Sequence, residues 1–399
     1  MNKVLDQIDP RILGQRLQDA RKAAGLTQQQ VADALSVART TVVAIEKGER
    51  RITPHELRTF ASVSSRSVSE LLSRRFVTEG FVPQFRALQH LDEEVERLTI
   101  KLQEYAEDYA ELESITKMPT VRVYPPVYET AGASPEQIGE DVANAERARL
   151  GMGDGPASDL RERLAVQVGI RIFYFEMPSK VAGLFAFNES LGACMAINSN
   201  HPLDRQTWSL AHEYGHFLMN RYQPDITVLF SKGRSSQRER MADAFAECFT
   251  MPESGLNRRV TELQRSLPNG ITLAHICELA NLYRVSVQAL VKRLENMKRL
   301  PNGTWERLIA EGFKVRTAQR QLGIDVSSSQ TDRFPRHYTV MAAYAFRHGL
   351  ISEGQLARFL RVDRLTARAL LESKPYEFHS EEELFALYSS DLGQRLTGS

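Results

Sequence analysis

The apolar residues between Leu88 and Leu112 recur without interruption at alternating steps of three and four: Leu91, Val95, Leu98, Leu102, Tyr105, Tyr109 and Leu112. An α-helix brings residues with this spacing onto one face, and a mean step of about 3.5 residues is typical of a coiled-coil seam. The positions between them are mostly Glu and Asp, which predicts that the other faces are solvated. We therefore expect a long helix that joins two chains into a homodimer through residues 88–112. One long helix packed on its own protein is the alternative.

The charge distribution divides the chain, which at 399 residues is too long for one ordinary core. Residues 1–80 contain 13 Lys and Arg against 9 Asp and Glu, whereas residues 91–113 contain 2 against 9. A basic head followed by an acidic helix indicates a nucleic-acid-binding module joined to another activity. Pro119 and the pair Pro125-Pro126 end the acidic helix and mark the next boundary.

Two classes of protein are disfavoured by composition. No apolar run approaches the roughly 18 residues of a membrane-spanning helix, and the N-terminus lacks the apolar core of a signal peptide, so we expect a cytoplasmic protein. Cys194, Cys248 and Cys277 lie far apart in apolar stretches without a CxxC pair. We expect them to be buried and reduced rather than paired or metal-binding.

The segment His212-Glu213-Tyr214-Gly215-His216 has the spacing of a metal site. Residues four apart lie on one face of a helix, so both imidazoles can bind one ion at about 2.0–2.1 Å. Glu213 lies beside them, where its carboxylate can take a proton from a water activated by zinc. This is the HExxH pattern of zinc peptidases. Two core histidines with ordinary partners are the alternative.

A third ligand is expected downstream, with one position left for water. Glu239 and Asp243 are four residues apart in RERMADAFAECF. Glu239 can bind the metal while Asp243 accepts the second N–H of a metal-binding histidine. Ser236 three residues before Glu239 also fits a helix capping box, in which Glu239 would bind its own backbone instead.

Short strands are expected at Ile170–Phe175, Leu184–Phe187 and Cys194–Asn198, between helical stretches. The chain beyond Ile271 has helical patterns, which predicts a mainly α fold with a small β-sheet. We expect an extended substrate to add along Cys194–Asn198 as a further strand.

HEYGHFL, followed by ExxADxFAxxFxMP, resembles the ImmA/IrrE family of bacterial and phage metallopeptidases, and the similarity covers about residues 119–300. The resemblance implies a zincin-like α+β domain that holds one Zn²⁺ per protomer through His212, His216 and Glu239, with Glu213 as catalytic base. Relatives cleave DNA-binding repressor proteins. The resemblance does not name the group that stabilises the oxyanion; Tyr222 and His275 are candidates by residue type.

LTQQQVADALSVARTTVVAIEKGER resembles an Xre-type helix-turn-helix. Thr27 is expected to cap the first of its helices. By that resemblance the DNA-binding residues are Gln28, which begins the positioning helix, and Arg39, Thr40, Thr41 and Ala44, which face the major groove. Ala38 departs from the family pattern, because relatives place a capping Ser or Thr there. A helix-turn-helix kept only for binding proteins is the alternative.

We therefore expect four regions: a helix-turn-helix domain at 1–78, an amphipathic linker helix at 79–118, a zinc metallopeptidase domain at 119–300 and a helical region at 301–399. The function expected is a transcriptional regulator that binds operator DNA and cleaves a repressor-type protein, or itself. A transcription factor that uses the peptidase fold only as a sensor or docking domain, or an antitoxin, is the alternative.

Overall fold

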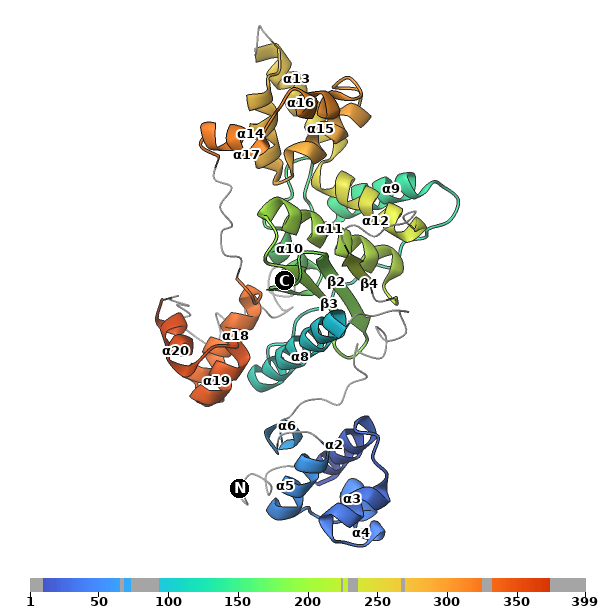
Figure 1. Cartoon of the computed structure of the whole chain (residues 1–399), viewed down its shortest axis with the longest axis vertical. Helices are drawn as coiled ribbons and strands as arrows, with labels where there is room; N and C mark the ends of the chain where they lie inside the picture. Colours follow the sequence, from blue (N-terminus) through green and yellow to red (C-terminus); the bar gives the residue numbers. More distant parts are fainter. Residues whose placement is uncertain are drawn as a thin grey trace, which may run out of the picture. The chain divides into compact units, whose positions relative to one another are not determined.

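The computed structural model describes residues 10–64, 68–72, 93–223, 225–228, 236–266, 270–324 and 332–373. Contacts divide the chain into two compact units, Met1–Glu79 and Gly80–Ser399. Both units are built mainly from helices, and the second also contains a small sheet (Figure 1). The expected fold class, mainly α with a small β-sheet, is confirmed. No helix in the described ranges is long and apolar enough to cross a membrane.

The N-terminal unit contains the helix-turn-helix. Thr27 begins its first helix with a full capping box, in which its Oγ accepts a hydrogen bond from the Gln30 N–H and the Gln30 side chain accepts one from the Thr27 N–H. Ser36 ends that helix in the left-handed conformation, and the next helix begins after Ala38, which offers no side-chain cap. The helices of this unit are α2 (Pro10–Ala23), α3 (Gln28–Leu35), α4 (Arg39–Glu46), α5 (Pro54–Val63) and α6 (Val68–Leu72).

The sheet of the second unit has the strand order β1-β3-β2-β4. Its strands are β1 (Arg171–Phe175), β2 (Val181–Asn188), β3 (Gly192–Asn198) and β4 (Asp225–Val228). β3 pairs in parallel with β1 and antiparallel with β2, and β2 pairs antiparallel with β4. The first three strands lie where the sequence predicts them, whereas β4 was not expected.

The central place of β3 overturns one expectation. Its backbone hydrogen-bonding groups are already engaged by β1 on one side and β2 on the other, so it has no edge to offer a peptide. The expectation that a substrate adds along Cys194–Asn198 is therefore wrong. The outer strands of the described sheet are β1 and β4. One backbone group of β1 is already bound outside the sheet, since the Tyr174 N–H donates to the Arg333 carbonyl at 2.9 Å.

Side chains alternate along the strands, so the sheet buries both faces. Ile172 and Tyr174 of β1 lie in a core with the helices on one face, whereas Phe173 and Phe175 lie in a second core on the other face. The helices that contribute to the first core are α9 (Pro135–Arg149), α10 (Leu160–Gln167), α11 (Leu203–Asn220) and α12 (Gln237–Thr250).

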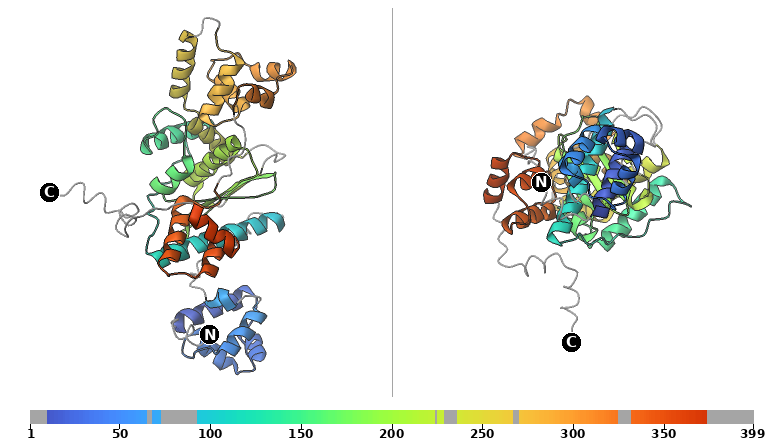
Figure 2. Two further views of the ribbon diagram at one scale, coloured as in Figure 1. Left: turned by 90° about the vertical axis from the view of Figure 1, so that its left-hand side faces the viewer. Right: turned by 90° about the horizontal axis from the view of Figure 1, so that it is seen from below.

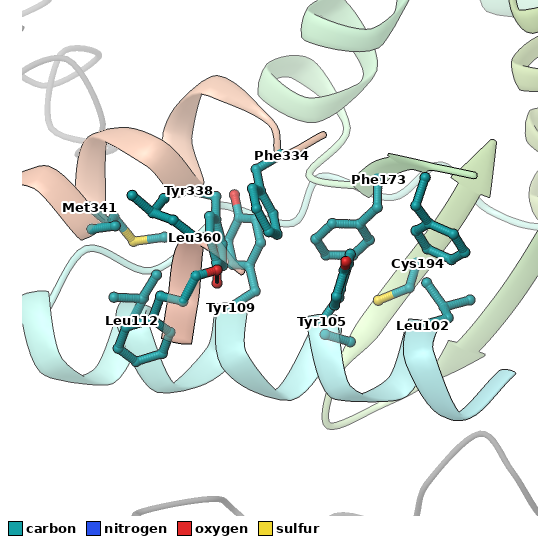
Figure 3. Packing of buried hydrophobic residues seen from close by; sticks show 14 of the residues in the cluster. Leu102, Tyr105, Tyr109, Leu112, Phe173, Cys194, Phe334, Tyr338, Met341 and Leu360 are labelled. Atoms are coloured by element: carbon teal, nitrogen blue, oxygen red, sulfur yellow. Dashed lines mark hydrogen bonds between the residues drawn. The ribbon is translucent and has the colours of Figure 1, made fainter. Parts of the chain in front are cut away.

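The long helix α8 (Glu93–Thr116) covers the second face of the sheet. The Tyr105 ring lies 5.4 Å from the rings of Phe173 and Phe175, centroid to centroid, and Leu102 and Leu112 are fully buried (Figure 3). The seam is therefore filled by the same chain, and the prediction that it joins two protomers is wrong. The alternative, a helix packed on its own protein, is confirmed for the described part of the seam; Leu88 and Leu91 lie outside it.

The C-terminal helices complete this second core. Figure 2 shows α8 alongside α18 (Arg336–Arg347), α19 (Glu353–Leu360) and α20 (Arg364–Ser373). Two acids of α8 that were expected in solvent are buried there. Asp108 pairs with Arg361 at 2.6 Å, and Glu111 pairs with Arg358 at 2.8 Å. These pairs bind two acids on the polar side of α8 to the end of α19.

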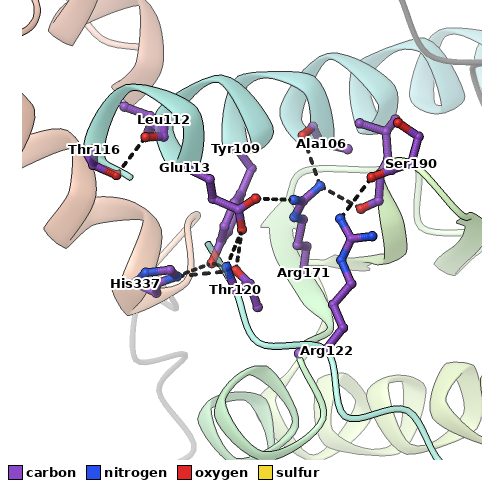
Figure 4. A network of polar contacts seen from close by, with 12 residues as sticks. Ala106, Tyr109, Leu112, Glu113, Thr116, Thr120, Arg122, Arg171, Ser190 and His337 are labelled. Carbon is purple, nitrogen blue, oxygen red and sulfur yellow. Dashed lines mark hydrogen bonds and ion pairs between the residues drawn. The ribbon is translucent and has the colours of Figure 1, made fainter. Parts of the chain in front are cut away.

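A buried polar network ties α8 to β1 and α18 (Figure 4). Arg171 lies 2.6 Å from Glu113, whose other oxygen accepts a hydrogen bond from Thr120. The Tyr109 hydroxyl and His337 Nδ1 are 3.0 Å apart. Buried charges are tolerated only with such partners, so the Arg171–Glu113 pair holds α8 on β1, whereas the Tyr109–His337 contact links α18 to α8.

We predict that acid weakens this docking through His337. Burial lowers the pKa of His337 to about 4, against about 6.5 in an unfolded chain. Between these values the unfolded chain binds a proton that the folded chain does not, so stability is lost as pH falls from 6.5 towards 4, by up to about 3 kcal/mol. Urea unfolding at pH 7 and pH 5 measures the effect. His337→Gln should flatten the pH dependence, whereas His348→Gln, at the exposed end of α18, should leave it unchanged.

The remaining helices form a third cluster in this unit. It contains α13 (Glu253–Ser266), α14 (Leu273–Tyr283), α15 (Val287–Asn296), α16 (Thr304–Ala310) and α17 (Val315–Gln321). The three cysteines are buried and unpaired, as expected.

Candidate metal centre

Helix α11 presents two histidines on one face. His212 and His216 are four residues apart, and their Nε2 atoms lie 3.0 Å from each other. Both side chains are buried, because the neighbouring Leu210, Phe217 and Leu218 fix this helix in the core against the sheet. Two imidazole nitrogens are thus held together away from bulk water.

A glycine lets the next helix approach the histidines. A Cβ on Gly215 would lie 3.1 Å from the Phe245 ring and 3.3 Å from the Ala242 Cα, both on α12. The absence of a side chain at Gly215 therefore brings α11 and α12 into close contact. This is the close backbone approach that justifies a glycine in the middle of a helix.

Glu239 of helix α12 lies beside both histidines. Its two carboxylate oxygens lie 3.4 Å from His212 Nε2 and 3.3 Å from His216 Nε2. The Glu239 N–H donates to Ser236 Oγ at 3.2 Å, but among the described hydrogen bonds the Glu239 side chain does not complete the capping box. The ligand atoms of the three residues all lie within 4.8 Å of one another.

Asp243 lies one turn further along α12 and faces the other nitrogen of a histidine. Its Oδ1 is 3.0 Å from His212 Nδ1. A carboxylate in this position fixes the orientation and tautomer of the ring, so that Nε2 is left for a metal.

The electrostatics of the cluster suit a cation. Burial acts to lower the pKa of His212, but Asp243 and Glu239 outweigh it and raise this pKa to about 10. Burial acts to raise the pKa of Glu239, but His212 and His216 outweigh it and hold this pKa well below the usual range. The cluster therefore attracts positive charge, and two nitrogens with one carboxylate form the donor set of hydrolytic zinc sites.

The other candidates are placed as follows. Glu213 is fully buried beside His212, on the side of α11 that faces the sheet. Tyr222 is 71% exposed, with its ring 5.5 Å from that of Phe187. His275 accepts a hydrogen bond from the Thr272 N–H in the cap of α14. His275 is not part of the group of His212, His216 and Glu239 that could hold a metal among the described residues.

In the N-terminal unit, the expected DNA-binding residues share one surface. Arg39 and Thr40 are exposed at the start of α4, and Thr41 and Ala44 are half-buried on the same helix. Arg39 Nη2 donates to Gln28 Oε1 at 3.4 Å. Gln28, the first expected contact residue of α3, therefore lies beside Arg39, the first of α4.

Two known domains match this chain. Residues 165–295 match the IrrE N-terminal-like domain of a peptidase family, and residues 12–71 match a helix-turn-helix domain. Together the two matches resemble the domain arrangement of the ImmA/IrrE family.

The IrrE N-terminal-like match covers all four strands and both helices of the metal cluster, but not α8 or α18–α20. No curated protein matches the chain. Among solved structures, ComR from Streptococcus suis aligns over 98% of this chain and 97% of its own at 12% identity, with a TM-score of 0.16, too low to indicate a common fold.

Because residues 12–71 match a helix-turn-helix domain, we predict a base-reading role for Arg39. On an operator selected from random duplexes, Arg39→Ala should cost about 1–3 kcal/mol of binding free energy and have little effect on scrambled DNA, because a bidentate contact to guanine is lost. Arg58→Ala removes an equal charge from the exposed side of α5 and is the matched control. Electrophoretic shift titrations measure both. An equal loss on operator and scrambled DNA would assign Arg39 to the phosphates.

Proposed function

We propose that this chain is a DNA-binding transcriptional regulator whose second unit is a zinc endopeptidase acting on a repressor-type protein, or on the chain itself. The observation that carries the proposal is the convergence of His212, His216 and Glu239 beside a buried Glu213. A domain that only docks a partner gains nothing from an acid in that position. Because the same chain contains a helix-turn-helix, a protein that acts on DNA is the substrate class that we propose.

His212, His216 and Glu239 would hold one zinc ion, and Asp243 would orient His212. When bound, zinc would lower the pKa of a water towards neutrality and polarise the scissile carbonyl. Glu213 would take a proton from the attacking water and deliver it to the leaving amine. Its burial keeps that proton from exchanging with bulk solvent during the transfer.

An extended substrate segment would pair with the outer edge of β4. β4 is an outer strand of the described sheet and contacts α11, the helix that carries both histidines. Pairing of backbone groups gives affinity for an extended peptide whatever its sequence. Such a mode suits a loop or linker of a repressor better than its folded core.

The test is to identify the protein that is cleaved in cells expressing this chain. Cells that express the chain are compared, by mass spectrometry of protein termini, with cells that express Glu213→Gln. The proposal expects a DNA-binding protein, or this chain, to be cut only in the presence of Glu213. Identical termini in both cultures, with zinc bound to both chains, would refute the endopeptidase and favour a sensor.

A further inference from the structure

Gly183 of β2 lies directly against the carboxylate of Glu213. A Cβ built on Gly183 would lie 2.5 Å from Glu213 Oε1, 3.0 Å from its Cγ and 3.1 Å from its Cδ. The first distance is shorter than any tolerated contact of a Cβ, so a side chain at position 183 and the present position of Glu213 exclude each other. Glu213 is fully buried, so the recess at Gly183 is part of what surrounds it.

A positive φ does not explain why this residue is glycine, and the register of β2 on β4 shifts between Val181 and Gly183. Gly183 is not among the glycines with a positive φ, so other residues could adopt its conformation. A glycine inside a strand is also unfavourable relative to alanine, because it has more conformational freedom to lose and no side chain to pack. Space for the Glu213 side chain is the property that alanine would remove.

The parts around the recess differ in how easily they can move. Gly183 is paired with Ile197 of β3 and Thr227 of β4, so β2 is held on both sides. α11 is fixed by its core residues, including Phe217. A methyl group at position 183 would therefore displace the flexible Glu213 side chain rather than the strand or the helix.

We propose that Gly183 is a positioning residue for Glu213: its missing side chain forms the recess that directs the carboxylate of the catalytic base. The inference rests on the proposed function for its effect on catalysis, but not for its effect on geometry. Replacement by alanine moves the base and leaves the metal ligands in place, because the three atoms nearest to a Cβ at position 183 all belong to Glu213.

The experiment compares Gly183→Ala with Gly155→Ala in the full chain. Gly155 has no atom within 4 Å of a built Cβ and no positive φ, so it is the matched control. Crystal structures should show the Glu213 carboxylate moved by about 1 Å or more in Gly183→Ala, with the three ligand side chains unmoved and zinc at one per chain. An unmoved carboxylate, or a shifted β2, overturns the inference whether or not the protein is a peptidase.

Kinetics on fluorescein-labelled casein test the catalytic consequence. Gly183→Ala should lower kcat roughly 100- to 10,000-fold, the usual contribution of a general base, with little change in KM. Glu213→Asp withdraws the carboxylate by one methylene and should recover part of that loss when combined with Gly183→Ala, although alone it lowers kcat. A full kcat in Gly183→Ala contradicts the proposal. Casein left intact by the wild-type chain would count against the peptidase alone, and the crystal structures would still decide the role of Gly183.

Discussion

Alanine at His212, His216 or Glu239 should leave the purified chain without zinc, whereas the wild-type chain should contain one ion. Each of these residues supplies one of three ligand atoms that lie within 4.8 Å of one another. Removing one leaves a two-ligand site that cannot hold zinc against dialysis. Glu213→Gln should keep the ion and lose roughly 100-fold or more in peptide cleavage, because its carboxylate moves a proton and binds no metal.

Graded variants make this zinc prediction specific. Asp243→Asn should weaken zinc binding by about 10- to 100-fold, because the aspartate orients His212 without binding the ion. His275→Ala removes a histidine outside the cluster and should change nothing. Elemental analysis and competition with a chromogenic chelator measure stoichiometry and affinity. Stoichiometric zinc in Glu239→Ala would remove Glu239 from the ligands and leave it as a residue of the α12 cap.

Leu102→Asp should unfold the second unit. Leu102 is fully buried in the core that α8 shares with the sheet and α18–α20. A carboxylate there has no partner, and the lost packing adds to the cost of burying it, a total of several kcal/mol. That is a large part of the stability of an ordinary domain. We expect the cooperative thermal transition of this unit to be lost or to fall by tens of degrees.

Ile100→Asp is the matched control for Leu102→Asp. It introduces the same charge on the same helix, but Ile100 is 41% exposed. Its transition should stay within a few degrees of that of the wild type. Circular dichroism and light scattering separate the two models of α8. If the Leu102→Asp protein stayed folded and its molecular mass in solution fell to half that of the wild type, the seam would join two chains after all.

The sequence predicted features that depend on neighbours in the chain. Thr27 was expected to begin α3, and it does, because a capping residue acts over only a few positions. The convergence of His212 with Glu239 was also expected, because the two motifs are recognisable together. Their distance in space was not a local property, and the structure supplies it.

The surface on which α8 packs could not be predicted in this way. A step of three and four residues is required equally by a coiled coil and by a helix that lies along a groove of its own protein. Phe173, Tyr338 and Leu360, which fill that groove, are far away in the sequence. Asp108 and Glu111 were wrongly expected in solvent for the same reason, because their arginine partners lie some 250 residues later. Gly183 gave no sequence signal, because its role depends on a side chain of another element.

The pairing of α8 with α18–α20 sets an order of events during synthesis. About 250 residues separate Glu111 from Arg358, which the ribosome takes roughly 10–50 s to add. During that interval the helix-turn-helix, which forms a compact unit of its own, can already be folded. α8 meanwhile has emerged with an apolar face that its late partners have not yet covered. Newly made chains therefore pass through a stage in which a folded helix-turn-helix is attached to a helix with an uncovered apolar face. Chaperones or proteases can bind α8 most readily at that stage.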